Sequence, residues 1–331
     1  MFNIDANRLN NLLGNINGQK IAVIGDIMLD RYFWGNVTRV SPEAPVPVVD
    51  IESETFHLGG AANVAKNLSS LGITPVLFGL IGNDEPGDIF INECNNCGIV
   101  ADGLFKENER ITTVKTRVIG NNQQLLRLDS EIRRKISKEA ETFIINELKK
   151  IQDLRAVIFE DYDKGTISQF LIENVVEFAN KNNIPVLVDP KFDNFLKYKN
   201  VTLFKPNKKE TMQGLGVELN SMEDVINAGK NLLNLLNAEY ILITLGKDGM
   251  VLLEKNGDIS AIPTVAKKIA DVSGAGDTAI AVFAALLTSG AECKEASVIA
   301  NFASGFVCEK PGIVAINQLQ LKETILNQKK L

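Results

Sequence analysis

Short, continuous apolar runs recur along the chain, and most are followed by a segment with helical spacing. Residues 20–24 (KIAVI) form one such run, which Gly25 ends. A run that is apolar throughout favours a strand buried on both faces of a parallel sheet. The expected strands are residues 20–24, 74–80, 156–160, 185–188, 201–205, 240–244, 250–254 and 259–263. The expected helices are residues 3–17, the later part of 58–71, 85–97, 166–181, 208–214, 222–236, 276–289, 292–309 and 317–328.

Strands that alternate with helices imply an α/β fold, with a doubly wound and mostly parallel sheet covered by helices on both faces. The last three strands follow one another without a helix between them, which suggests an antiparallel edge. The chain contains no repeat, low-complexity tract or flexible linker. We therefore expect a single domain over residues 1–331.

Two segments, residues 31–58 and 110–129, break this alternation. The first contains three prolines in six positions followed by alternating apolar residues, and prolines suit edge strands. The second has two alternating stretches around Gly-Asn-Asn, which is a hairpin signal. We expect both segments to form one small β-sheet inserted in the domain, acting as a lid, as a surface for a homodimer, or as both.

Residues 271–287 (DVSGAGDTAIAVFAALL) begin polar and glycine-rich and become almost wholly apolar, as in a helix buried on all sides. Gly274, Ala275 and Gly276 would present free backbone N–H groups, which attract anions at a helix start. Asp277 follows directly. An anion cradle beside a carboxylate provides two of the parts of a phosphoryl-transfer site. A glycine-rich loop capped by an aspartate fits the same residues.

Composition excludes several classes of function. The chain is 45% hydrophobic and 23% charged, with a net charge of −6 and no basic block, which argues against nucleic acid as a partner. No apolar run reaches the ~20 residues of a membrane span, and no signal peptide is evident, so we expect a cytoplasmic protein. His57 is the single histidine, which leaves little for triads or histidine-based metal sites. Cys94 and Cys97 share a face of an expected helix, and we expect buried free thiols.

Polar clusters stand at the ends of expected strands or the starts of expected helices. If the sheet is parallel, they converge on one cleft. The chain has no GxxxxGK[ST] loop and no GxGxxG after a strand, so a nucleotide would bind in another way. The clusters are Asp26 with Asp30, Gly59-Gly60 with Asn63, Asp189 with Lys191, Asn207 with Glu210, and residues 274–277.

Three motifs stand in order along the chain: residues 59–63 (GGAAN), 207–210 (NKKE) and 271–277 (DVSGAGD). With them the chain resembles the ribokinase-like (PfkB) family of carbohydrate kinases over nearly its full length. Ser273 stands where the family often has threonine, which is a conservative change. The resemblance implies a ribokinase-like fold and phosphoryl transfer from ATP to a sugar hydroxyl, with Mg²⁺ and, in some relatives, K⁺.

A closer resemblance is to the kinase part of the bacterial heptose enzymes of lipopolysaccharide-core synthesis. These enzymes phosphorylate D-glycero-β-D-manno-heptose 7-phosphate at C1. The matching stretches are GDIMLDRYFWG (25–35), SPEAPVPVV (41–49), LGGAANVAKNL (58–68), NNQQLLRLD (121–129), EDYDKG (160–165) and DPK (189–191). The second and fourth are not general to sugar kinases and carry most of the weight for the substrate. Many such relatives have a nucleotidyltransferase half with an HxGH-type motif. These 331 residues contain none, so we expect kinase chemistry alone.

The resemblance also implies roles for individual residues. Asp277 would be the base for the C1 hydroxyl and should stay ionised at a helix N-terminus. The N–H groups of residues 274–276 would hold the transferring phosphoryl group. Asn207 and Glu210 would place Mg²⁺, through water, and the ATP phosphates, although Asn and Glu three apart are also the signature of a capping box.

The remaining implied roles concern the nucleotide, the sugar and a monovalent ion. The nucleotide side would comprise Thr244, Gly246, Gly249 and, near the adenine, Asn301; a hairpin turn fits the first three equally well. The sugar hydroxyls would be bound by Asp26, Asp30, Gly59, Gly60 and Asn63. The candidates for the phosphate of the sugar are Lys191, Arg117 and Arg127, although surface charge also explains the arginines. Asp271 would lie at a K⁺ site or would simply cap a loop.

Two other functions remain open. A ribokinase-like kinase of another sugar, sugar phosphate or nucleoside would share the same motifs, and the 41–49 and 121–129 stretches argue against it. A non-catalytic sugar-phosphate sensor would keep the fold but should lack Asp277 or the glycine cradle, and the chain has both. A dehydrogenase would need the GxGxxG fingerprint that is missing.

Overall fold

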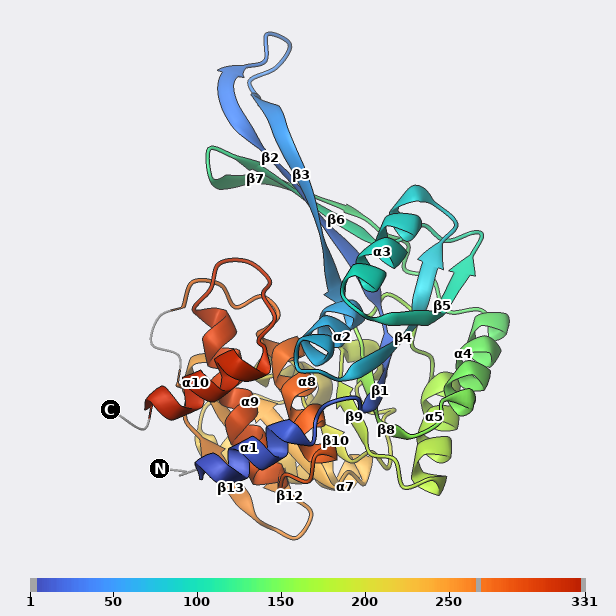
Figure 1. The fold of residues 1–331 in the computed structure, drawn as a ribbon, viewed down its shortest axis with the longest axis vertical. Coiled ribbons are helices and arrows are strands. Elements are labelled where there is room, and N and C mark those ends of the chain that lie inside the picture. The colour runs from blue at the N-terminus through green and yellow to red at the C-terminus, as the bar shows by residue number, and fades with distance from the viewer. Residues whose placement is uncertain (1–4, 266–268, 329–331) are drawn as a thin grey trace.

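A computed structural model describes residues 5–265 and 269–328 (Figure 1). Its main sheet has nine strands in the order β13-β12-β11-β10-β9-β8-β1-β4-β5. The seven strands from β11 to β5 run parallel, while β12 and β13 are antiparallel, so the expected mostly parallel sheet with an antiparallel edge is confirmed. The strands are β1 Lys20–Gly25, β4 Thr74–Gly82, β5 Val100–Glu107, β8 Leu154–Glu160, β9 Val186–Asp189, β10 Leu203–Phe204, β11 Tyr240–Thr244, β12 Met250–Glu254 and β13 Ile259–Ile262.

Helices cover both faces of this sheet (Figure 1). Alternate residues of β1 enter different cores: Ile21 and Val23 pack on one side, Ala22 and Ile24 on the other. This is why the strand is apolar throughout. The first side carries α1 Ala6–Gly14, α2 Ala61–Ser70, α3 Glu85–Asn96, α8 Ala275–Thr288, α9 Cys293–Cys308 and α10 Gln318–Gln328. The second carries α4 Lys138–Lys150, α5 Gln169–Lys181, α6 Lys208–Leu215 and α7 Met222–Leu236.

Two elements were not expected from the sequence. Strand β5 lies at the edge of the sheet, where only part of its surface is buried, so it carries no continuous apolar run. Helix α4, in contrast, has a readable signal. Its buried residues Ala140, Ile144 and Leu148 lie at helical spacing, and Ser137 caps its first turn. Helix α1 is also shorter than the expected 3–17, of which residues 3 and 4 lie outside the described part.

The two interrupting segments form one separate four-stranded sheet, which we call the lid. Its order is β3-β2-β6-β7, with strands β2 Ile27–Val40, β3 Pro47–Gly60, β6 Val114–Gly120 and β7 Gln123–Ser130. The expected small sheet is therefore confirmed, although it begins four residues earlier than expected. Asn121 and Asn122 both have positive φ, as a tight turn between β6 and β7 requires. Figure 1 shows the β2–β3 hairpin projecting from the molecule, with residues 41–46 at its free end.

Several expectations from composition can be compared with the structure. Cys94 is a buried free thiol, and burial raises its pKa to about 12. Cys97 is also free but is partly exposed, so the expectation of burial holds for only one of the two. Among the described helices, none is sufficiently long and apolar to cross a membrane.

Candidate active site

The first turn of α8 has the geometry of an anion cradle. Gly274 is the N-cap residue, and its φ of 77° lies in the left-handed region that glycine adopts without strain. A Cβ there would lie 2.9 Å from Asn63 Nδ2. At Gly276, two residues on, a Cβ would lie 3.5 Å from both Asp189 Oδ2 and Lys205 Nζ, which is ordinary contact. Two small residues therefore leave the backbone N–H groups of this turn open, next to a lysine.

Asp277 is buried at the third position of α8 and is held by two donors. Asn63 Nδ2 donates to its Oδ2 at 2.7 Å, and the Tyr162 hydroxyl donates to its Oδ1 at 3.0 Å. Burial raises the pKa of Asp277, and the two hydrogen bonds oppose the rise. Loss of hydration has the larger effect on this pKa, and the expectation that Asp277 stays ionised remains a prediction. A carboxyl with a raised pKa is better matched to taking up a proton.

Asp277 belongs to a cluster of three buried carboxylates with Glu160 and Asp189, each with an oxygen within 4.8 Å of the others. Lys205 Nζ lies 2.7 Å from Asp189 Oδ2 and is buried with it. The pKa of Glu160 is raised well above its ordinary value by burial and then by its two acidic neighbours. Oxygen donors of this kind suit a hard divalent cation.

Sequence reasoning did not assign roles to Glu160, Tyr162 or Lys205. The first two lie in the 160–165 stretch, where β8 ends, and the third follows the short strand β10. Their position at the carboxyl ends of parallel strands was the available signal.

Two buried acceptors in the site lack a donor among the described residues. Asn63 uses its Nδ2 for Asp277, and its Oδ1 receives no hydrogen bond. Glu160 Oε2 is in the same situation. A buried polar atom without a partner is unfavourable, so both atoms favour a ligand that brings hydroxyl or metal partners.

Asp26, which was expected to bind sugar hydroxyls, is engaged by the backbone of a neighbouring loop. Its carboxylate accepts hydrogen bonds from the backbone N–H groups of Tyr162 (2.8 Å), Lys164 (3.0 Å) and Thr166 (3.0 Å). It therefore fixes the 162–166 loop, and with it the tyrosine that donates to Asp277.

Asp30 on β2 forms a salt bridge with Arg117 on β6, so the structure brings these two candidate residues together within the lid. The glycines beside them allow this close approach. A Cβ at Gly59 would lie 2.4 Å from Asp30 Oδ2, and one at Gly60, where φ is +60°, would lie 2.3 Å from the Asp26 carbonyl oxygen.

Asn207 and Glu210 form the capping box of α6, as the alternative interpretation had it. Asn207 Oδ1 accepts from Glu210 N at 2.8 Å, and Glu210 Oε2 accepts from Asn207 N at 2.8 Å. The other carboxylate oxygen pairs with Lys191. Lys191 Nζ also lies 5.3 Å from the centre of the Tyr162 ring, which connects α6 to the surroundings of Asp277.

Three of the residues expected on the nucleotide side lie at the end of β11 and in the turn after it, and β11 is the next strand of the sheet after β9 and β10. Thr244 ends β11 and bridges to Asn207. Gly246 and Gly249 frame a 3₁₀ turn, and a Cβ at Gly249 would lie 2.0 Å from Ile262 O. Asn301 Nδ2 donates to Pro263 O at 2.7 Å, so this side chain supports the end of β13.

Arg127 and Asp271 lie at the edge of this arrangement. Arg127 is half-exposed on β7 and pairs with Asp129. Asp271 Oδ1 accepts from Ser273 N at 2.9 Å, which is the loop cap of the alternative interpretation.

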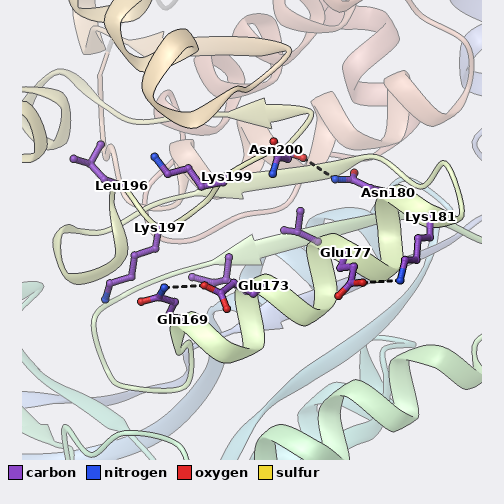
Figure 2. A pocket seen from close by; sticks show the side chains of 11 residues that line it. Gln169, Glu173, Glu177, Asn180, Lys181, Leu196, Lys197, Lys199 and Asn200 are labelled. Carbon is purple, nitrogen blue, oxygen red and sulfur yellow. Dashed lines mark hydrogen bonds and ion pairs between the residues drawn. The ribbon is translucent and has the colours of Figure 1, made fainter.

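A separate surface hollow of about 460 Å³ lies between α5 and residues 196–200 (Figure 2). Its charged side chains are largely engaged with neighbours: Lys181 pairs with Glu177, and Lys199 Nζ donates to Leu235 O. It shares no residue with the surroundings of Asp277.

A mostly parallel sheet, a helix N-terminus beside a buried carboxylate and a β-sheet lid together define the ribokinase-like class of proteins. The sequence model of the pfkB family of carbohydrate kinases matches residues 18–318, and the chain belongs to this family. It is an ATP-dependent carbohydrate kinase, which transfers a phosphoryl group to an alcohol.

Among curated relatives, the bifunctional protein HldE of Desulfatibacillum aliphaticivorans is 40% identical over 310 residues, which cover 93% of this chain and 63% of that protein. The bifunctional protein HldE of Helicobacter pylori J99 is 39% identical over 311 residues, covering 94% and 67%. The chain thus spans less than two thirds of the first of these relatives.

Solved structures show the same fold at low identity. Phosphofructokinase-2 from Escherichia coli in complex with potassium matches with a TM-score of 0.78 and 16% identity, over 95% of this chain and 99% of that one. Ribokinase from Arabidopsis thaliana, complexed with ribose and ATP, matches with a TM-score of 0.70 and 17% identity, over 93% and 99%.

Proposed function

We propose that the chain phosphorylates the C1 hydroxyl of D-glycero-β-D-manno-heptose 7-phosphate with ATP and releases the 1,7-bisphosphate on the route to ADP-heptose. The observation that carries the proposal is Asp277, a buried carboxylate beside the open first turn of α8. The similarity to HldE proteins over nine tenths of the chain supports the heptose substrate. So do the 41–49 and 121–129 stretches, which are not general to sugar kinases.

In this proposal Asp277 takes the proton from the C1 hydroxyl as that oxygen attacks the terminal phosphorus of ATP. The bond from this phosphorus to the bridging oxygen of ADP breaks. The backbone N–H groups of residues 274–276 hold the oxygens of the transferring group, where negative charge is concentrated. Lys205 lies close enough to Gly276 to add a positive charge at the same place. Tyr162 and Asn63 hold the carboxylate in position.

The free acceptors Asn63 Oδ1 and Glu160 Oε2 are proposed to receive hydrogen bonds from hydroxyls of the sugar. Asp30, Gly59 and Gly60 would line the same region, while Asp26 would act indirectly through the 162–166 loop. A site built to hydrogen-bond hydroxyls discriminates strongly against analogues that lack them.

ATP would lie toward Thr244, Gly246, Gly249 and Asn301, with its phosphates directed at α8. The oxygen donors of Glu160, Asp189, Asn207 and Glu210 fit Mg²⁺, which keeps several waters and binds few carboxylates directly. When bound, the ion would neutralise charge on the ATP phosphates.

Asp271 is the proposed K⁺ site. One structural neighbour was solved with potassium, and comparing rates in K⁺ and Na⁺ salts tests this proposal.

The purified chain should release ADP when it is incubated with ATP, Mg²⁺ and heptose 7-phosphate, and much less with unphosphorylated heptose, fructose 6-phosphate or ribose. Mass spectrometry should detect heptose 1,7-bisphosphate and no ADP-heptose. Faster turnover of another sugar in the panel would replace the proposed substrate. ADP-heptose among the products would show that the 331 residues do more than kinase chemistry.

A further inference from the structure

One face of the lid is turned toward Asp277. In the register of β2, β6 and β7, Lys115 stands opposite Asp30 and Asp129, and Arg117 stands opposite Arg127. Residues directly opposite each other share a face of a sheet. Lys115 Nζ lies 6.0 Å from the centre of the Tyr162 ring, and the hydroxyl of this ring donates to Asp277. We call this surface the cleft face of the lid.

The charges on the cleft face do not cancel. Arg117 is paired with Asp30, and Arg127 is paired with Asp129. Lys115, within the part of the chain that the structure describes, has no salt bridge and no hydrogen bond of its side chain. Its ammonium is partly buried, and that burial lowers the pKa of Lys115, while Asp30 opposes the change. A partly desolvated cation that forms no salt bridge gains more from an incoming anion than one that is already paired.

The other cations near Tyr162 already form ion pairs. Lys191 pairs with Glu210, Lys164 with Glu131 and Lys205 with Asp189. Each would have to loosen an existing ion pair to bind an anion, whereas Lys115 would lose none.

The order of the strands places Lys115 on the sugar side. Asp277 has its carboxylate neighbours on β8 and β9. Thr244 and the glycines after it follow β11, on one side of these strands, while the lid grows out of β1, on the other. An anion bound at Lys115 would therefore lie on the opposite side of Asp277 from Thr244 and the glycines that follow it.

We propose that Lys115 binds the phosphate monoester that the sugar already carries, and so makes the enzyme select phosphorylated over free sugars. This inference rests on the proposed function and adds a residue to it, beside the earlier candidates Lys191, Arg117 and Arg127. The sugar then spans the Tyr162 side chain, with its reacting hydroxyl at Asp277 and its phosphate at Lys115.

The test compares Lys115→Met, Lys115→Arg and wild type with heptose 7-phosphate, unphosphorylated heptose and ATP as the varied substrates. Lys115→Met should lower kcat/KM for heptose 7-phosphate by about 10- to 100-fold, the contribution of one hydrogen bond to a charged group. The change should be mainly in KM. Values for unphosphorylated heptose and the KM for ATP should stay within about twofold, and Lys115→Arg should recover most of the loss.

Lys106→Met is the matched control, because Lys106 lies on β5 and pairs with Asp88 away from the site. It should change none of these constants. Thermal unfolding should show Lys115→Met to be at least as stable as wild type, since it removes a desolvated charge without a partner. Equal loss for both sugars, or a raised KM for ATP, would overturn the inference.

Failure of the inference is distinguishable from failure of the proposed substrate. If wild type prefers fructose 6-phosphate, the heptose assignment fails, and Lys115→Met is judged on that sugar phosphate instead. If wild type turns over only free sugars, the role of Lys115 is wrong while the kinase remains. If wild type turns over none, calorimetric titration with heptose 7-phosphate decides, and equal binding or no binding in wild type and Lys115→Met overturns the role.

Discussion

Asp277 balances two opposed effects at the scale of a single residue. Burial favours its neutral form, whereas the donors on Asn63 and Tyr162 favour its charged form. Because burial prevails, the folded-state pKa lies above the unfolded one. Ionising Asp277 therefore costs folding free energy, and this cost appears as the pH rises above the ordinary range of an aspartate.

Asp277→Asn should keep the fold and lose most of the turnover. The amide matches the carboxylate in size, and Asn63 can rotate its own amide to offer the free Oδ1 to the new N–H₂ group. The variant has no carboxylate to take the proton, so kcat should fall by ~10²–10⁴-fold, the usual contribution of a general base, with little change in the KM for ATP. Steady-state ADP release measures both constants.

At pH 8, thermal unfolding should show an Asp277→Asn variant that is as stable as wild type or more stable, and any gain in stability should shrink toward acid pH. Retention of a third of wild-type kcat would mean that Asp277 is not the base.

Tyr162→Phe should move the acid limb of the kcat profile to higher pH. The variant loses the hydroxyl that donates to Asp277 Oδ1, so the pKa of Asp277 should rise further. Activity should then fall more at pH 6 than at pH 9. Tyr240→Phe is a suitable control, because this hydroxyl interacts with Cys293, away from the cluster. An acid limb that stays in place, or moves to lower pH, would show that Tyr162 does not tune the base.

The sequence indicated the candidate site residues that belong to motifs, namely Asp277, Gly274 and Asn63, and the structure places them next to one another. It did not indicate what Asp26 does. Three backbone N–H groups of one loop donate to the Asp26 carboxylate, and the path of that loop cannot be predicted from the identities of its residues. Nor did the sequence indicate the direction in which the pKa of Asp277 shifts, since burial depends on the packing of α8 against distant strands.

At the scale of elements, the start of α8 contains two glycines that serve different structural purposes. Gly274 supplies a left-handed backbone conformation, while Gly276 supplies open space at ordinary φ. A valine at Gly276 would thus crowd the cradle, but the strain of this turn resides at Gly274. Sequence patterns found α8 itself because it is apolar all round. They missed β5 because an edge strand buries only part of its surface.

Gly274→Ala should destabilise the protein by about 1–2 kcal/mol, the cost of a left-handed residue that has a Cβ. The new methyl would also press on Asn63 Nδ2, so kcat should fall. Gly276→Ala should leave folding unchanged or improve it, since alanine favours a helix by roughly 0.5–1 kcal/mol over glycine. Its methyl would still narrow the cradle and raise the KM for ATP. Urea unfolding and ADP release measure the two properties separately. Equal unfolding midpoints for the two variants would refute this division.

At the scale of the whole molecule, the lid is the part that lies outside the nine-stranded sheet. Every residue of β7 is exposed, and Leu126 and Leu128 are each 53% exposed. These two leucines stand opposite Val118 and Thr116, on the face away from the cleft. Apolar residues exposed on an edge strand favour pairing with another chain, which supports the proposal of a homodimer through the lid.

Leu126→Glu combined with Leu128→Glu should therefore give a monomer under conditions where wild type is a dimer. Two carboxylates on the contact face would have to be buried beside their symmetry mates, which is unfavourable without partners. Light scattering after size-exclusion chromatography, repeated over a range of concentrations, measures the mass of each species. Leu319→Glu is the matched control, because Leu319 is 65% exposed and lies on α10, which is not part of the lid. A wild type that stays monomeric at all concentrations, with sugar and ATP as well as without them, would exclude this assembly and leave the lid a cover for its own cleft.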